Sequence, residues 1–343
     1  MKSEDSHQHV LKIGRLSLPG PVIVCPIAGY TDYAYRSILR RYTQALMFAE
    51  MVSVSGLIRD GRGSLFRIRK SPDHHPLGIQ LFGCEPKLFY EAARKVEEAG
   101  FDLVDVNLGC PKIPGEQLAG SRLLRFPKLV GEIIAAMRKA VQIPVTAKIR
   151  MGYDVDNLNG HEIAKIVEEE GGDGVTVHGR TCVQKFSGSS NWDWIGQVKS
   201  SVSIPVIGNG DLDTPQKVRQ FMDYTGVDGV MIGRAALGRP WLIRDMEDFL
   251  NGKPLLPTPS LKEMGQDLLY HLSLVKQTEG ETGLKRKMRR ILSMYFKSME
   301  GVKEFRRKCH QARTYEEIVK LIHQFLEKNT AHDETRAPTH SLL

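Results

Sequence analysis

Eight short apolar runs, each followed by a longer segment with helical periodicity, limit most strongly how this chain can fold. The runs begin at Pro21, Ala45, Pro76, Asp102, Pro144, Asp173, Pro205 and Asp228. Strands of a parallel sheet have such continuous apolar sequences because helices cover both faces of the sheet. Eight strand–helix units in about 230 residues predict an α/β fold, the (β/α)8 TIM barrel. A doubly wound sheet is the alternative, but no GxGxxG turn follows the first run, PVIVCPIAGYTD.

The segment after the eighth unit has a different character. Residues 251–260, NGKPLLPTPS, are rich in proline and predict a linker. Residues 261–328 have helical periodicity and no strand pattern, which predicts an all-helical C-terminal domain. We therefore expect the barrel domain over residues 11–250. Residues 1–10 and 329–343 are expected to be disordered.

Composition excludes several classes of protein. With 41% hydrophobic and 26% charged residues, the chain is not one that is disordered as a whole. No run approaches the roughly 20 consecutive apolar residues of a membrane span, and the first residues lack a signal sequence, so we expect a cytoplasmic protein. Five cysteines without a CxxC pair indicate neither a disulfide framework nor a metal site.

Positive charge is concentrated near the C-terminus. The net charge is +8, and residues 284–314 contain eleven Lys or Arg against two acids, which leaves the rest of the chain at about −1. Lys285, Arg286, Arg289 and Arg290 belong to an amphipathic helix whose apolar residues recur every three or four positions. A solvated helix face is one interpretation. The scarcity of acids favours the other, a surface that binds nucleic acid or another polyanion.

Polar or small residues end all eight apolar runs. In TIM barrels the C-terminal ends of the strands form the active site, so these residues are the candidates. They are Pro26, Ala28, Glu50, Gln80, Asn107, Cys110, Lys148, His178, Arg180, Asn209, Gly210, Asp211, Gly233 and Arg234. Their convergence on one mouth of the barrel favours a ligand-binding site.

Two of these groups predict a phosphate site. GNGD at residues 208–211 and IGR at residues 232–234 follow the seventh and eighth runs. They combine small residues, backbone N–H groups and an arginine at the place where barrels often bind phosphate. A pair of tight turns is the alternative interpretation.

Three side chains at the mouth are candidates for chemistry. Lys148 could form a Schiff base, or could stay protonated and hold an anionic, electron-accepting ring. His178 is either a ligand contact or a core histidine bonded to a loop carbonyl. Cys110 lies on a loop beyond the fourth strand, where a thiol can act as acid, base or nucleophile. The other four cysteines are expected to be buried and inert.

Seven motifs together resemble the tRNA-dihydrouridine synthases, most closely the bacterial B type. They are NLGCP (107–111), KIRMG (148–152), HGRT (178–181), FSGSSNWDWI (186–195), PVIGNGD (205–211), DGVMIGRAALGRPW (228–241) and GLKRKMRRILSMYFK (283–297). Their order and spacing agree with the family from Val22 to the end of the helical segment. The last motif is similar to the family's helical tRNA-binding domain.

The resemblance implies an enzyme that uses FMN and NADPH to reduce particular uridines of tRNA to 5,6-dihydrouridine. Hydride would come from the flavin and a proton from Cys110. Implied cofactor contacts are Pro26, Ile27, Ala28, Gln80, Lys148, His178, Asn209, Gly210, Asp211, Gly233 and Arg234. Expected substrate contacts are Asn107, Arg180, Lys285, Arg286, Arg289 and Arg290. We expect a monomer whose partner is tRNA.

One segment departs from the family pattern. The loop after the cysteine, KIPGEQLAGSRLL at residues 112–124, is one residue shorter and has Leu118 at the first glycine of a glycine-rich GxG. This departure leaves open a catalytically inactive RNA-binding relative. An FMN-dependent barrel oxidoreductase that acts on a small molecule is also an alternative, because it would share the phosphate site. The basic helical segment opposes the small-molecule enzyme, and the presence of Cys110 and Lys148 opposes the inactive relative.

Overall fold

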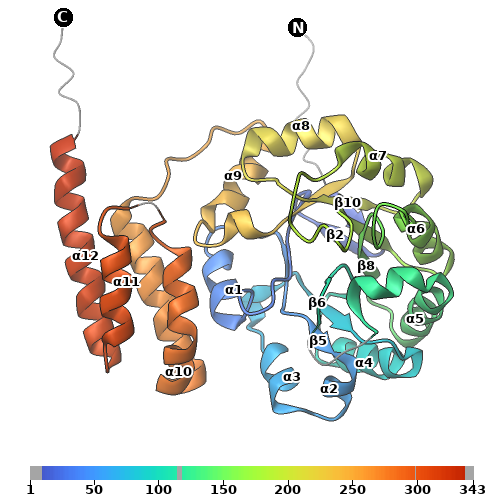
Figure 1. The fold of residues 1–343 in the computed structure, drawn as a ribbon, viewed down its shortest axis with the longest axis horizontal. Coiled ribbons are helices and arrows are strands. Elements are labelled where there is room, and N and C mark those ends of the chain that lie inside the picture. The colour runs from blue at the N-terminus through green and yellow to red at the C-terminus, as the bar shows by residue number, and fades with distance from the viewer. Residues whose placement is uncertain (1–9, 114–117, 298, 337–343) are drawn as a thin grey trace, which may run out of the picture. The chain divides into compact units, whose positions relative to one another are not determined.

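A closed barrel of eight parallel strands forms the centre of the first structural unit (Figure 1). The structure is a computed structural model that describes residues 10–113, 118–297 and 299–336. The barrel strands are β3 (Val22–Val24), β4 (Leu46–Phe48), β6 (Leu77–Phe82), β7 (Leu103–Leu108), β8 (Val145–Arg150), β9 (Gly174–His178), β10 (Val206–Asn209) and β11 (Gly229–Ile232). Pairing of β11 with β3, and of β4 with β6, closes the sheet, and the short strand β5 (Val52–Ser53) pairs with the end of β6. Each strand lies in one of the eight predicted runs, so the predicted barrel is confirmed.

Helices connect the strands and cover the outside of the barrel. They are α1 (Tyr33–Arg40), α2 (Val54–Ile58), α3 (Arg62–Arg67), α4 (Pro86–Glu98), α5 (Pro127–Ala140), α6 (Gly160–Glu169), α7 (Trp192–Ser201), α8 (Pro215–Thr225) and α9 (Trp241–Leu250). Short 3-10 helices occupy Pro72–His74, Gly120–Arg125 and Arg234–Ala236. Proline begins α4, α5 and α8. It costs no hydrogen bond there, because the N–H groups of the first helical turn have no acceptor within the helix. Figure 1 shows α4 to α8 following one another around the barrel.

Proline and aspartate fix the starts of neighbouring strands. A proline precedes β6, β8 and β10, and the first N–H of each strand binds the carboxylate that precedes the following strand, at 2.7–2.8 Å. Leu77 donates to Asp102, Val145 donates to Asp173, and Val206 donates to Asp228. Each carboxylate also contacts a basic side chain, respectively His75, Arg138 and Lys199. These contacts satisfy N–H groups that the sheet itself leaves unpaired.

A hairpin that the sequence analysis did not predict closes the N-terminal end of the barrel. Strands β1 (Leu11–Ile13) and β2 (Leu16–Leu18) pair in antiparallel fashion. Leu11, Ile13 and Leu18 are buried in one cluster with barrel residues that include Ile23 and Ile207. In the described part of the chain, apolar side chains therefore fill this end of the barrel.

The second structural unit is helical. It comprises residues 237–241 and the described residues from 256 onward. The first unit comprises the described residues up to 236 together with residues 242–255. Its helices are α10 (Leu261–Met294), α11 (Val302–Gln311) and α12 (Tyr315–Arg336). One division, between residues 255 and 256, lies within the expected linker, whereas residues 237–241 of the expected barrel domain group with the helices. Helix α12 continues beyond the expected end of the helical domain at residue 328. Residues 1–9 and 337–343 of the ends expected to be disordered lie outside the described residues, whereas residues 329–336 belong to α12.

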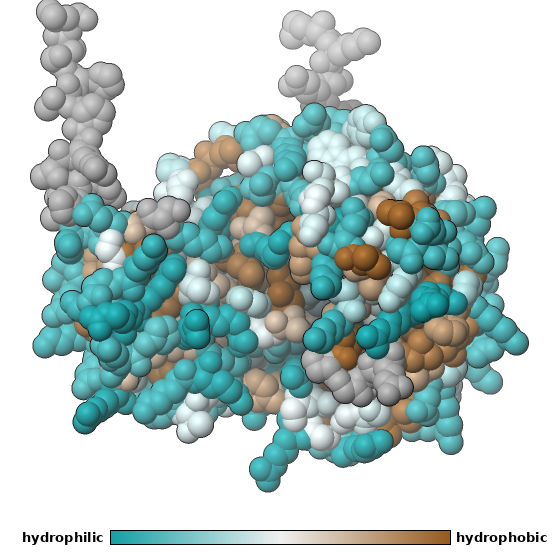
Figure 2. All heavy atoms as spheres, in the orientation of Figure 1, coloured by the Kyte–Doolittle hydropathy of each residue, from teal (hydrophilic) through white to brown (hydrophobic). Residues whose placement is uncertain are grey.

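Helix α10 is bent at Gly280. The φ of 68° and ψ of −175° at this residue are accessible to glycine but not to residues with a Cβ. Stacking of Phe305 on Phe325, with ring centroids 4.4 Å apart, joins α11 to α12 in the core of this unit. The face of the unit visible in Figure 2 is predominantly hydrophilic. Over the described part of the chain, no helix is both long and apolar enough to cross a bilayer.

Candidate active site

A cavity of about 730 Å³ lies at the C-terminal ends of the barrel strands. This volume is typical of a site for a small molecule or cofactor. Every residue that the resemblance assigns to the cofactor lines it, together with Asn107 and Cys110. These residues come from seven strands or the loops that follow them, and only the parallel closure of the barrel brings them together.

Lys148 is held in place on the cavity wall by Asn209. Its Nζ donates a hydrogen bond of 3.0 Å to Oδ1 of Asn209, and Nδ2 of Asn209 donates to the carbonyl of Met231 at 2.7 Å. The second bond fixes which amide atom faces Lys148. Burial lowers the pKa of Lys148, and the neighbouring carboxylate of Asp105 opposes that shift.

His178 is neutral and lies among cations. Burial lowers its pKa to about 2, and the positive charges of Lys148, Arg150, Arg180 and Arg234 act in the same direction. Protonation of His178 would add a fifth positive charge to the four cations. These four cations create a positive potential that suits an anionic group such as phosphate.

Gly210 lets other groups lie close to the backbone beside His178. Its φ is +129°, and a Cβ at this position would lie 2.5 Å from Oγ of Ser190 and 3.0 Å from Cδ2 of His178. Only glycine therefore fits here. Together with the cations around His178, this backbone suits a phosphate group, and many barrels bind phosphate at the loops after their last two strands.

Arg180 does not line the cavity, in contrast to the expectation that it contacts substrate. Its side chain is 2% exposed and donates to Oδ2 of Asp211 at 2.6 Å and to the carbonyl of Gly188. Asp211 also accepts the N–H of Ser190 at 2.9 Å. Burial opposes ionisation of Asp211, but the bonds from Arg180 and Ser190 outweigh it and lower the pKa of this carboxyl. Arg180 thus fixes the loop that carries Asp211.

Asn107 fixes the start of the loop that carries Cys110. Its Nδ2 donates to Oε1 of Gln80 at 2.6 Å, and its Oδ1 accepts the N–H groups of Gly109 and Cys110 at 3.1 and 2.8 Å. The Cys110 thiol lines the cavity and lies 3.3 Å from the carbonyl oxygen of Lys112. Residues 114–117 of the unusual loop lie outside the described part of the chain.

Several residues that line the cavity were not predicted. Arg150 follows Lys148 by two positions, so the alternation of the strand places both side chains on one face. Phe186 is 56% exposed, with the guanidinium of Arg234 4.5 Å from its ring centroid. Cys25 was expected to be buried and inert, but it is half-buried, lines the cavity, and has a pKa that burial raises. Cys84 is also half-buried.

The predicted basic residues of α10 differ in their surroundings. Lys285, Arg286 and Arg289 are exposed, and Arg290 is half-buried. Arg286 forms an ion pair of 2.9 Å with Glu279, an acid that precedes the basic segment 284–314. The same Glu279 pairs with the buried Lys287. The basic surface is therefore smaller than the sequence count suggests.

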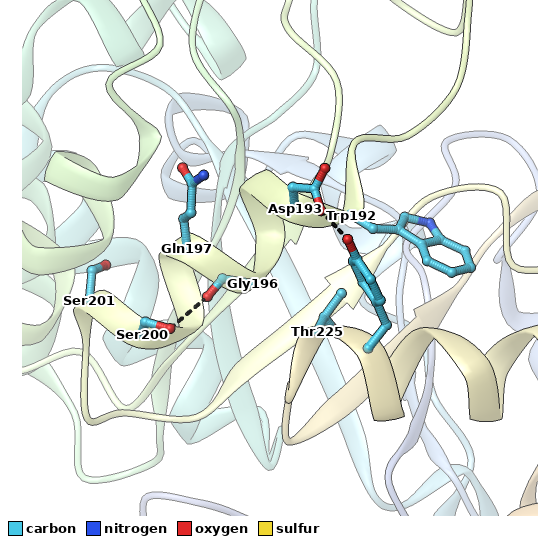
Figure 3. Close-up of a pocket in the computed structure, with 8 residues that line it drawn as sticks. Trp192, Asp193, Gly196, Gln197, Ser200, Ser201 and Thr225 are labelled. Carbon is cyan, nitrogen blue, oxygen red and sulfur yellow. Dashed lines mark hydrogen bonds between the residues drawn. The ribbon is translucent and has the colours of Figure 1, made fainter.

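A second hollow, of about 650 Å³, lies between α7 and α8 on the outside of the barrel (Figure 3). Trp192, Asp193 and Tyr224 line it, and the Tyr224 hydroxyl donates to the carboxylate of Asp193. None of the predicted site residues contributes to its walls. The cavity at the strand ends is therefore the candidate active site.

Comparison with known proteins identifies the family. A family model described as dihydrouridine synthase (Dus) matches residues 22–332. The chain is a member of the dihydrouridine synthase family. The tRNA-dihydrouridine synthase B of Pseudomonas aeruginosa is 37% identical over 317 residues, which are 92% of this chain and 96% of that protein. The corresponding protein of Pseudomonas putida is 40% identical over 86% of this chain and 88% of its own length.

A solved structure supports the fold of this dihydrouridine synthase. Histamine dehydrogenase from Rhizobium sp. 4-9 matches it with a TM-score of 0.54 at 14% identity, over 79% of this chain and 51% of that chain. At this identity the likeness shows the barrel fold alone. The family predicted from the sequence motifs is confirmed by the family model and by the relatives.

Proposed function

We propose that this dihydrouridine synthase reduces uridines in tRNA to 5,6-dihydrouridine, with FMN as its cofactor and NADPH as the reductant. The names of its curated relatives support tRNA as the substrate. The observation that carries the proposal is the cavity in which Cys110 lies with Lys148, Asn209, His178 and Arg234. A thiol and a wall rich in positive charge thus belong to one site.

The residues of the cavity fit a flavin mononucleotide. Arg234, His178 and the backbone at Gly210 would hold its phosphate, and Lys148 with Gln80 would bind the polar edge of its ring. A protonated lysine there stabilises negative charge on the ring. When bound and reduced, the flavin supplies a hydride to the C5–C6 bond of the uracil.

Cys110 supplies the proton that the reduction also needs. A protonated thiol on the loop over the cavity can act as a general acid toward the second carbon of the double bond. Asn107, whose amide already orients the Cys110 backbone, lies where it can also contact the uracil. A uridine of folded RNA must be flipped out of its stack to reach this cavity. Backbone phosphates of the tRNA would meet the exposed cations of α10.

The test is the formation of dihydrouridine in tRNA that lacks it. Purified protein is incubated with such tRNA, FMN and NADPH, and nucleosides are measured by mass spectrometry. We expect product from the wild type, a decrease of at least about 100-fold for Cys110→Ala, and unchanged flavin content in that variant. Cys84→Ala, at a half-buried cysteine outside the cavity, is the matched control.

Each other outcome rejects a stated part of the proposal. Full activity of Cys110→Ala would show that another group is the acid. A flavin-loaded wild type without product would point to a small-molecule substrate. A protein that binds neither FMN nor NADPH but binds tRNA would indicate an inactive RNA-binding relative.

A further inference from the structure

A chain of buried hydrogen bonds runs from the interior of the barrel to the Cys110 loop. Asp105 on β7 is 1% exposed and does not line the cavity. Its Oδ2 accepts a bond of 2.7 Å from Nε2 of Gln80, and its Oδ1 accepts one of 2.7 Å from the hydroxyl of Thr146. Gln80 continues to Asn107, and Asn107 to the N–H of Cys110, at 2.6 and 2.8 Å. No role assigned so far to the site uses Asp105.

The chemistry of the donors and acceptors gives this chain one direction. An ionised carboxylate only accepts hydrogen bonds, so Gln80 must turn its NH2 group toward Asp105. Its oxygen then faces Asn107, which must present its own NH2 group there. The oxygen of Asn107 is left to accept the N–H groups of Gly109 and Cys110. The carboxylate of Asp105 at one end and the backbone N–H groups at the other therefore agree on one orientation for each amide.

Asp105 also carries a charge near the site, and that contribution must be separated from its hydrogen bonds. Burial raises the pKa of Asp105 to about 6, while the bonds from Gln80 and Thr146 and the charge of Lys148 oppose the shift. The group is therefore mainly ionised at pH 8. Either its charge or its acceptor oxygens could matter to the site.

We propose that Asp105 is a positioning residue for Cys110, acting through the fixed orientations of Gln80 and Asn107. The acceptor oxygen facing Gln80 is what the position requires, rather than the negative charge. The effect of this residue on turnover rests on the proposed function, because it assumes that Cys110 is the acid. Its effect on the geometry of Cys110 does not.

Two variants separate the acceptor from the charge. Asp105→Asn keeps an oxygen toward Gln80 and turns its NH2 group toward the Thr146 hydroxyl, which can accept. It should retain kcat within about threefold of the wild type. Asp105→Leu removes the acceptor, so Gln80 can rotate and Asn107 loses its fixed partner. A thiol misplaced by about 1 Å should lower kcat about 10- to 100-fold at saturating FMN, with the KM for tRNA unchanged within about twofold. Thr146→Val, which leaves the Gln80 bond intact, is the matched control.

A second measurement reports on Cys110 without turnover. FMN-loaded protein is treated with iodoacetamide, and the alkylation rate of each cysteine is followed by peptide mass spectrometry. Asp105→Leu should change the rate at Cys110 at least about threefold and leave that of Cys84 unchanged, whereas Asp105→Asn should match the wild type. If Asp105→Leu does not fold, Gln80→Met decides, because it cuts the same chain one link later with a side chain of similar shape. Because Gln80 is also a proposed flavin contact, this variant is compared with the wild type in flavin-free protein.

The outcomes distinguish this inference from the proposed function. If Asp105→Asn fails together with Asp105→Leu, the charge is required and the inference is wrong. It is also wrong if Cys110 alkylation is unchanged in both Asp105→Leu and Gln80→Met. If the wild type forms no dihydrouridine, the proposed function fails, and the alkylation rates still test the positioning of Cys110.

Discussion

Arg234 is the exposed member of the cation cluster around His178. Its side chain is 59% exposed, it stacks on Phe186, and it lies 3.9 Å from the carboxylate of Asp211. Asp211 is already bound by Arg180, so it neutralises Arg234 only in part. A guanidinium in this position can donate two parallel hydrogen bonds to a phosphate without losing a buried partner.

We predict that Arg234→Gln weakens the binding of FMN about tenfold and leaves that of riboflavin nearly unchanged. The two flavins differ only in the phosphate, and a charge-assisted hydrogen bond at a partly exposed site stabilises a complex by about 1.5 kcal/mol. Fluorescence titration of the flavin-free protein measures both affinities. Arg94→Gln, on the outer face of α4, is the control. An equal loss for both flavins would place Arg234 away from the phosphate.

Residue positions were predictable where the barrel dictates them. Lys148, His178 and Asn209 lie at or near the C-terminal ends of successive strands, and these ends converge in a barrel, so their place in one cavity followed from the sequence. Arg180 lies two residues beyond the end of β9. Its direction depends on the folded loop and on Asp211, which local patterns do not encode. The partners of Asp105 come from β6 and β8, so they too appear only in the fold.

At the level of elements, strands were easier to predict than the hairpin and the ends of helices. The eight apolar runs have a long-range repeat, whereas β1 and β2 have three residues each and alternate only briefly. Helix α12 reaches Arg336, although the sequence after residue 328 is polar, because polar residues do not by themselves stop a helix. The bend at Gly280 in α10 likewise depends on the conformation of one residue.

The structure divides the basic residues of the helical unit into two kinds. Lys285 and Arg289 are exposed one turn apart on α10, and among the described residues neither has an ion pair. Arg306 instead donates to the carbonyls of Leu292 and Tyr295, which caps the end of α10. Exposed cations are available to phosphate, whereas Arg306 holds α11 against α10.

We predict that Lys285→Gln with Arg289→Gln weakens tRNA binding without a change in Tm. Each lost phosphate contact should reduce the slope of log K against log salt by up to about 0.9. Filter binding across a series of salt concentrations gives the slope, and NADPH oxidation should stay at the wild-type rate. Arg306→Gln is the contrasting variant, because it should lower Tm by a few degrees. A double variant with the wild-type salt slope would exclude this face from the tRNA contact.

Over the whole barrel unit, buried ionisable groups make stability depend on pH. Burial lowers the pKa of His74 to about 4, so this histidine stays neutral in the folded chain at pH values where the unfolded chain already binds a proton there. Burial also raises the pKa of Glu247 on α9 to about 7, with the charge of Asp248 acting in the same direction. His74 therefore destabilises the fold as pH falls below 6.5, and Glu247 does so as pH rises above 4.5.

We predict that Glu247→Gln stabilises the protein at pH 8 by about 1–3 kcal/mol and has little effect at pH 4.5. Between pH 4.5 and 7 the unfolded chain loses the Glu247 proton while the folded chain keeps it, so the wild type loses stability as pH rises through this window. Glutamine removes that ionisation and keeps an oxygen for the hydroxyl of Thr43, 2.6 Å from the carboxylate.

Calorimetric Tm values at pH 4.5, 6 and 8 test this dependence, with Glu98→Gln on the exposed face of α4 as the control. The difference between the Glu247 variant and the wild type should grow from pH 4.5 to 8, because only the wild type has a carboxyl that must ionise in the folded barrel. A difference that is constant with pH would mean that Glu247 titrates alike in the folded and unfolded chains. A variant less stable at every pH would mean that the Thr43 contact needs the carboxylate itself.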